Sequence, residues 1–266
     1  ERCLEILCQG FPQAPIYTLV HEPDRVSDTI NRHDIITTPL QAPGIRRFFR
    51  AALPLFPAFI ERLQPPQADV LISTSHCVAK GINPAEGTRH VCYCFTPMRY
   101  GLFYNEYFGK NPLKEVVVRP WLAALRRWDV RASDRVDRFV AISEHVRRRI
   151  QYLYQREADL VYPPVDTDHY TPGPSCSEDY DLIVSALVPY KRIQLAVEAY
   201  NRMGLPLRIV GTGSDYQKLR RLAGPTIAFT GWQTDTQILE HYRGCRFFIF
   251  PGEEDFGIAP VEAQAC

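Results

Sequence analysis

Short apolar runs alternate with helical patterns along almost the whole chain, and this alternation most constrains what the chain can fold into. The runs are rich in Val, Ile, Phe and Tyr and end in Gly, Ser or Pro, as buried parallel strands do. Strands that alternate with helices are typical of doubly wound α/β sheets. The predicted strands cover residues 15–20, 69–74, 90–95, 138–143, 180–187, 206–211, 226–231 and 246–251, and the predicted helices cover 45–63, 113–132, 144–155, 190–203, 214–223, 234–243 and 258–266.

A proline-rich segment divides the chain. The stretch "YPPVDTDHYTPGPSCSED" has four prolines and no hydrophobic periodicity, which indicates a linker. We therefore predict an N-terminal domain over residues 1–162, a linker over 163–178 and a C-terminal domain over 179–266. Ligands of such sheets bind at the carboxyl ends of the strands, so we expect the two domains to face a cleft.

Charge and composition exclude several classes of protein. A net charge of +1 is too small to attract nucleic acid to the protein as a whole. No apolar run approaches the roughly 18 residues of a membrane span. Eight cysteines without a C-x-x-C pair are typical of reduced thiols in a cytosolic protein. The histidines show no metal-ligand spacing, so a structural zinc site is not expected.

The end of the chain, "GEEDFGIAPVEAQAC", carries two carboxylates in different settings. Glu254 lies in a predicted loop and Glu262 in a predicted helix. Both can accept hydrogen bonds from hydroxyl groups, which suits a sugar and a ribose. Gly257 and Ile258 would offer backbone N–H groups at the start of the helix, where phosphate binds well. The alternative is an acidic loop followed by a solvated helix residue.

The stretch "SALVPYKRIQLAVEAY" places Lys191 and Arg192 where a helix begins. Cations are unfavourable at that end of the helix dipole, so a bound diphosphate would explain them. The alternative is a pair of ordinary surface cations. The nearby "VGTGSDY" lacks the third glycine of the dinucleotide fingerprint, because Tyr216 occupies that position, so a nicotinamide cofactor is not expected.

Two stretches of the N-terminal part follow predicted strands. "DVLISTSHCVAKGI" places His76 just beyond a strand end, where a lone histidine is either functional or structural. "CFTPMRYGLFY" offers Arg99, Tyr100 and further aromatic residues, which suit an acceptor pocket for sugar rings. The D-x-D patterns at 166–168 and 179–181 are interpreted as turn chemistry, not as a metal site.

Together these motifs resemble the retaining, nucleotide-sugar-dependent glycosyltransferases of the GT-B fold, of the group 1 or family 4 type. The likeness is greatest to O-antigen mannosyltransferase-like members, which act in polysaccharide biosynthesis. It is carried by "ISTSH", "YCFTPMRY", "VAISEHVRRRI", "IVGTGSDYQKL" and the two stretches that contain Lys191 and Glu254. The resemblance implies that Glu254 and His76 contact the donor sugar, Glu262 the ribose and Lys191 a phosphate, and that the backbone of Phe256, Gly257 and Ile258 meets the diphosphate and sugar.

The chain departs from the family pattern in three places. Many members carry an arginine a few residues before the lysine; Ala186 stands near that place here, and Arg192 is expected to substitute for it. Members usually begin with a strand and a glycine-rich loop, and they continue beyond the last motif. We therefore expect a GT-B chain that is truncated at both ends.

These observations predict a metal-independent, retaining hexosyltransferase. It would move a hexose, such as mannose, from a nucleoside-diphosphate sugar to a glycan or lipid-linked acceptor, with no cofactor and no nucleic-acid partner. The alternatives are a sugar-nucleotide epimerase or phosphorylase on a similar fold, and a catalytically dead nucleotide-binding homologue.

We expect a cytoplasmic location. The basic and aromatic stretch "GIRRFFRAALPLFPAFIERL" (44–63) suits an amphipathic helix in peripheral contact with the inner face of the cell membrane. Its alternative is a helix packed within the acceptor domain, and Pro54 and Pro57 interrupt its pattern.

Overall fold

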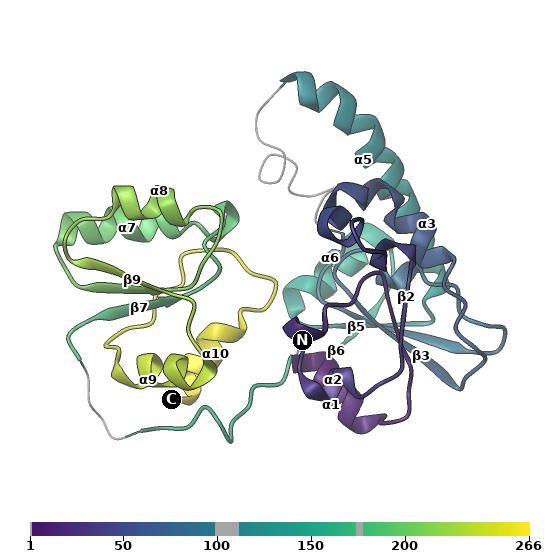
Figure 1. Cartoon of the computed structure of the whole chain (residues 1–266), viewed down its shortest axis with the longest axis horizontal. Coiled ribbons are helices and arrows are strands. Elements are labelled where there is room, and N and C mark those ends of the chain that lie inside the picture. Colours follow the sequence, from purple (N-terminus) through teal and green to yellow (C-terminus); the bar gives the residue numbers. More distant parts are fainter. Residues whose placement is uncertain (1, 99–111, 174–177) are drawn as a thin grey trace. The chain divides into compact units, whose positions relative to one another are not determined.

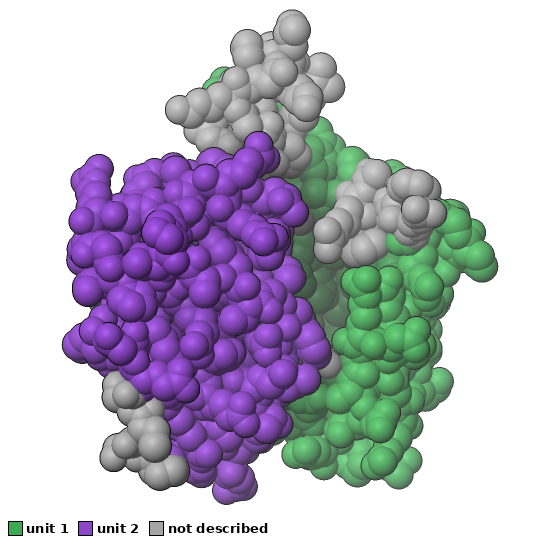
Figure 2. All heavy atoms as spheres, turned by 60° about the vertical axis from the view of Figure 1, so that its left-hand side comes forward, with its two compact units in different colours: residues 1–164 green, residues 165–266 purple. Residues whose placement is uncertain are grey.

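The computed structural model describes residues 2–98, 112–173 and 178–266, with backbone alone at 47–51 and 112–118. The chain divides into two compact units, residues 1–164 (unit 1) and 165–266 (unit 2), which Figure 2 colours separately. The boundary lies within the stretch predicted as a linker. All paired strands of both units run parallel, which confirms the predicted α/β class.

The described residues of unit 1 form two parallel sheets (Figure 1). The larger sheet follows the chain order β3-β4-β5-β6, and β1 pairs with β2 in the smaller one. In β4, Cys92 and Cys94 are both buried on one face, as the period of two in a strand requires. The strands are β1 (Ile16–Thr18), β2 (Ile35–Thr37), β3 (Val70–Ser75), β4 (Arg89–Cys94), β5 (Arg138–Ala141) and β6 (Ala158–Leu160).

Local signals explain where the helices of unit 1 begin and end. The Ser143 hydroxyl accepts a hydrogen bond from Val146 N at 3.1 Å and so caps α6, and Gln155, with φ 56°, ends that helix in the left-handed conformation. The helices are α1 (Arg2–Gly10), α2 (Asp28–Asn31), α3 (Phe56–Glu61), α5 (Pro112–Ala132) and α6 (Glu144–Tyr154).

The prediction of one continuous helix over 45–63 is wrong. A 3₁₀ helix, η3 (Arg46–Leu55), precedes the short α3, because Pro54 and Pro57 each remove a backbone donor that one continuous α-helix would need. Phe56 and Ile60 of α3 are buried in the core of unit 1. Ile45 and Leu55 of the same stretch are 50% and 54% exposed, and the side chains of 47–51 lie outside the described residues, so the membrane contact stays a prediction.

Unit 2 is built on one parallel sheet in the order β7-β8-β9. Figure 1 shows α7 and α8 on one face of this sheet and α9 and α10 on the other. Leu182 and Ile183 of β7 are both buried, since neighbouring residues of a strand face opposite sides and both sides are covered. The elements are β7 (Asp181–Val184), β8 (Leu207–Val210), β9 (Ile227–Gly231), α7 (Ile193–Met203), α8 (Tyr216–Leu222), α9 (Asp235–Gly244) and α10 (Ile258–Ala265).

The predicted last strand, 246–251, does not form a regular strand. It lies beside β7 through a single parallel bridge between Leu182 and Phe248. Two backbone bonds of 2.8 Å hold the bridge, from Leu182 N to Phe247 O and from Ile249 N to Leu182 O. Across this edge of unit 2 the order is therefore the Phe248 segment, β7, β8 and β9.

Candidate active site

Three loops of unit 2 follow parallel chain segments and meet at their carboxyl ends. Glycines allow their backbones to touch. A Cβ on Gly213, after β8, would collide with the backbone of Leu187, after β7. A Cβ on Gly252, after the Phe248 segment, would lie 2.8 Å from the carbonyl oxygen of Lys191. Only a residue without a side chain fits at these two contacts, so the glycines determine how the loops come together.

Lys191 and Glu254 form an ion pair across two of these loops. Lys191 ends a short 3₁₀ helix, η7 (Pro189–Lys191), and its Nζ also lies 5.3 Å from the centre of the Tyr190 ring. The side chains of Lys191 and Glu254 are only 18% and 12% exposed. The fold thus brings two predicted donor-site residues into direct contact, 63 residues apart in sequence.

Arg192 follows immediately and turns the chain into α7. Its φ of 53° is left-handed, and the residue is exposed at the N-cap of the helix. The cation of Arg192 at this end of α7 opposes the helix dipole, whereas that of Lys191 is compensated by Glu254. A phosphate bound here would be stabilised by Arg192 and by the positive end of the helix, with Lys191 next to it.

The loop that carries Glu254 ends at Gly257, whose φ of 81° begins α10. The predicted backbone contacts Phe256 and Ile258 flank this glycine, and all three residues are partly exposed. The first N–H groups of a helix have no partner within it, so the start of α10 can donate hydrogen bonds to an anion.

Glu262 is placed differently from Glu254. It is 7% exposed in α10, and the Tyr242 hydroxyl of α9 donates to its Oε2 at 3.2 Å. Burial, followed by the charge of Glu262, raises the pKa of Tyr242, so this hydroxyl stays a donor. Glu262 is therefore not a solvated helix residue, the alternative that its sequence context allowed.

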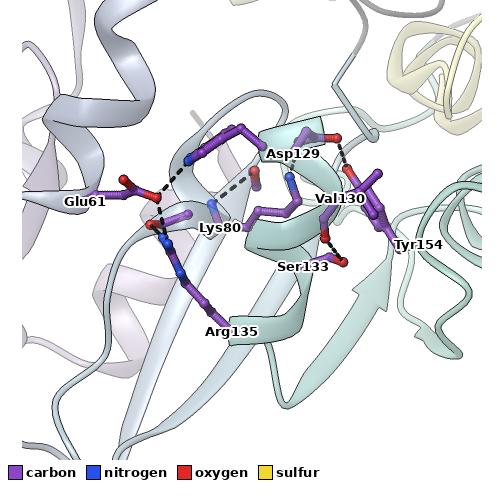
Figure 3. A network of polar contacts seen from close by, with 10 residues as sticks. Glu61, Lys80, Asp129, Val130, Ser133, Arg135 and Tyr154 are labelled. Atoms are coloured by element: carbon purple, nitrogen blue, oxygen red, sulfur yellow. Dashed lines mark hydrogen bonds and ion pairs between the residues drawn. The ribbon is translucent and has the colours of Figure 1, made fainter. Parts of the chain in front are cut away.

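In unit 1, His76 lies directly after β3 and is exposed. The chain behind it is fixed by a buried polar network (Figure 3). Lys80, 1% exposed, forms an ion pair with Asp129 of α5, which also accepts a 2.8 Å hydrogen bond from the Tyr154 hydroxyl. These contacts hold the turn after His76 against α5 and α6.

The same network reaches a second carboxylate. Arg135 donates to Gly81 O at 2.6 Å and to Glu61 at 2.7 Å, and Glu61 also accepts from Trp128 Nε1 at 2.7 Å (Figure 3). The pKa of Glu61 is lowered because these hydrogen bonds outweigh the opposing effect of its burial. Beside His76, burial raises the pKa of the Cys77 thiol to about 12, so Cys77 is not a nucleophile at neutral pH.

The predicted acceptor residues Arg99 and Tyr100 lie outside the described residues. The first D-x-D pattern is turn chemistry, as expected, because Asp166 Oδ1 accepts from the backbone N of Asp168 and His169 at 3.2 and 3.0 Å. The second is not: Asp181 is a buried strand residue paired with Arg246 at 3.0 Å. In the part of the chain that the structure describes, no group of three His, Cys, Asp or Glu side chains is placed to hold a metal.

Sequence reasoning missed three contributors to this site. Gly213 belongs to an incomplete dinucleotide fingerprint, and no motif of the sequence assigns a role to Gly252 or Tyr242. A glycine within two residues of the end of a predicted strand, as Gly213 and Gly252 are, is the signal that could have identified the two loop contacts. The pairing of Tyr242 with Glu262 depends on how two helices pack, so no local pattern announces it.

Comparison with known families identifies the chain. The family model described as "Glycosyltransferase Family 4" matches residues 1–169, more than half of the chain. The chain belongs to this family. A second model, "Glycosyl transferases group 1", matches residues 176–266.

Curated relatives of this glycosyltransferase family member share stretches of it. A D-inositol 3-phosphate glycosyltransferase of Mycobacteroides abscessus is 30% identical over 52% of the chain and 34% of its own length. An uncharacterized glycosyltransferase of Methanocaldococcus jannaschii is 23% identical over 51% of the chain and 39% of its own length. A serotype-specific mannosyltransferase of Escherichia coli is 26% identical over 35% of the chain and 13% of its own length. The chain thus spans well under half the length of these relatives.

Solved structures confirm the predicted GT-B fold. Sucrose-phosphate synthase of Thermosynechococcus elongatus aligns with a TM-score of 0.67 at 14% identity, over 98% of this chain and 71% of that one. HepE of Anabaena, solved with UDP and glucose, aligns with a TM-score of 0.60 at 13% identity, over 99% and 74%. At such identities the likeness concerns the fold alone.

None of the described helices has the length and hydropathy that a membrane crossing requires.

Proposed function

We propose that the protein is a retaining glycosyltransferase that moves a hexose, mannose by its likeness to the mannosyltransferase, from a nucleoside-diphosphate sugar to a glycan or lipid-linked acceptor. The observation that carries the proposal is the contact between Lys191 and Glu254 at the carboxyl ends of the strands of unit 2. One side chain suits a phosphate and the other suits sugar hydroxyls. An epimerase or phosphorylase is not favoured, since the matching families and relatives are glycosyltransferases.

In this proposal the leaving diphosphate develops negative charge beside Lys191, Arg192 and the N-terminal end of α10. Fixed cations and N–H groups stabilise such charge without a metal ion. Glu254 accepts hydrogen bonds from the donor sugar, Glu262 holds the ribose, and His76 contacts the sugar, as the family resemblance implies. Retention follows when the acceptor hydroxyl attacks from the face that the diphosphate leaves. The reaction would take place in the cytoplasm, with lipid-linked acceptors at the inner face of the cell membrane.

Calorimetric titration with GDP, UDP and ADP tests the donor site and identifies the base. Hydrogen bonds to charged groups contribute about 1.5–3 kcal/mol, so Lys191→Met should weaken nucleoside-diphosphate binding by roughly tenfold or more. Arg202→Met is a matched control, because Arg202 is an exposed cation at the far end of the same helix α7.

Glu254→Gln separates a donor-site role from a structural one. If the ion pair only holds two loops together, both substitutions should weaken nucleotide binding alike. If Lys191 binds phosphate and Glu254 binds sugar, Glu254→Gln should leave diphosphate affinity intact and lower turnover by roughly 10²-fold, as the loss of other preorganised polar groups does. Wild-type affinity in the Lys191→Met variant would refute the proposal.

A further inference from the structure

One large aromatic side chain is exposed at the same edge of unit 2. Trp232 follows β9 directly and is 73% exposed. The other two tryptophans of the chain, Trp121 and Trp128, belong to unit 1 and pack against its core. An exposed indole of this size lacks the favourable free energy that burial of its apolar surface would provide.

The loop that holds Trp232 is short and fixed at both ends. Gly231, before it, has φ 74° and accepts a 2.7 Å hydrogen bond from Gly211 N of the loop after β8. The Gln233 side chain, after it, donates to Thr230 O at 3.1 Å. Thr234 then begins α9 with a reciprocal capping box. The backbone that presents Trp232 is therefore well anchored.

The order of the strands assigns a position to each part of a nucleotide sugar. Glu254 follows the Phe248 segment, Lys191 follows β7, Gly213 follows β8 and Trp232 follows β9. Neighbouring strands lie about 4.8 Å apart, so roughly 14 Å separate the outer two segments. Glu254, at one side of this row, suits the sugar, and Lys191, next to it, suits the diphosphate. The Trp232 flank, two strand spacings beyond Lys191, is left for the nucleoside.

From this order we propose that the Trp232 ring stacks on the base of the bound nucleoside diphosphate. This inference rests on the proposed function and adds the residue that holds the base. A flat indole suits any base, because every base has a π-face, and stacking of this kind is sequence-tolerant. Trp232 thus contributes affinity, and the choice between bases falls to other contacts.

The test compares ligands with and without a base on the same protein. Stacking contributes about 1–3 kcal/mol per base by alanine substitution, so Trp232→Ala should weaken binding of the preferred nucleoside diphosphate roughly 5- to 150-fold. Its affinity for inorganic pyrophosphate should be unchanged, and Trp232→Phe should restore most of the nucleotide affinity. Because the side chain is exposed, Trp232→Ala is expected to fold, which circular dichroism can verify.

Fluorescence provides a second readout. Trp232 is the only tryptophan of unit 2, so nucleotide should quench a signal that is present in the wild type and lost in Trp232→Phe. Equal nucleotide affinities of the wild type and Trp232→Ala, with pyrophosphate still bound, would overturn the stacking and leave the donor site standing. If neither nucleotide nor pyrophosphate bound to the wild type, the proposed function would fail and the stacking with it.

Discussion

Replacement of Lys80 by methionine should severely destabilise unit 1. Methionine keeps most of the volume of the side chain and removes the ammonium. Asp129, itself 5% exposed, then keeps a hydrogen bond from Tyr154 and loses its cation. Breaking a buried ion pair costs about 3–5 kcal/mol, because an uncompensated charge stays inside.

Two aromatic contacts add to this cost. Lys80 Nζ lies 4.9 Å from the centre of the Tyr154 ring and 5.8 Å from that of Trp128. Desolvated cation–π contacts of this kind contribute up to about 2 kcal/mol. Domains are stable by only about 5–15 kcal/mol, so Lys80→Met should remove a large share of the stability of unit 1.

A double-mutant cycle with Asp129→Asn isolates the charge pair. Each single variant leaves one buried charge, whereas the double variant leaves none and keeps an amide oxygen for the Tyr154 hydroxyl. The double variant should therefore cost less than the sum of the single variants, by up to about 3 kcal/mol. The matched control is Arg138→Met, because the Arg138–Asp159 pair is 66% and 46% exposed and should contribute under about 1 kcal/mol.

Urea unfolding followed by tryptophan fluorescence measures these effects. In a Trp232→Phe background, the two remaining tryptophans, Trp121 and Trp128, both report on unit 1. If Lys80→Met costs no more than the exposed control pair, or if the cycle is additive, the ion pair does not hold unit 1 together and our account of the His76 turn is wrong.

Two further predictions concern solution conditions. Burial lowers the pKa of His90, although its hydrogen bond to Arg135 O opposes this shift. The unfolded chain therefore binds a proton at a higher pH than the folded chain, and the free energy of unfolding of unit 1 should fall as the pH drops below about 6.5. His90→Asn should flatten this pH dependence in urea titrations. Nucleoside-diphosphate affinity and turnover should survive EDTA, since cations and N–H groups can neutralise the diphosphate; a complete loss, reversed by added Mg²⁺, would revive Asp166 and Asp168 as metal ligands.

Much of the fold was predictable from the sequence because most elements carry a clear hydrophobic period. Seven of the eight predicted strands overlap observed ones, since runs such as 180–187 are long enough to show burial on both faces, as Leu182 and Ile183 do. The exceptions depend on tertiary context. β2 and β6 have three residues each and lie in no longer apolar run, unlike β1, and the 246–251 run forms only one bridge with β7.

The candidate site was predictable only in part. Lys191 and Glu254 stand in recognisable local patterns, but their contact results from the close packing of two loops at Gly252. Trp232 had no sequence signal, because the exposure of an aromatic residue depends on tertiary packing. Its exposure is decided by Gly231 and the helix cap that follows.

The spacing between Glu254 and Glu262 has a structural reason. Gly257 lies between them with φ 81°, a conformation that residues with a Cβ rarely adopt, and a Cβ there would approach the Phe250 ring to 3.1 Å. This bend lets Glu254 remain in the loop that meets Lys191, while α10 carries Glu262 to Tyr242 on the α9 side of the sheet. One carboxylate is therefore paired with a cation and the other accepts from a neutral hydroxyl. In the proposed donor site, two residues so close in sequence would hold different parts of one donor, and this separation depends on the glycine between them.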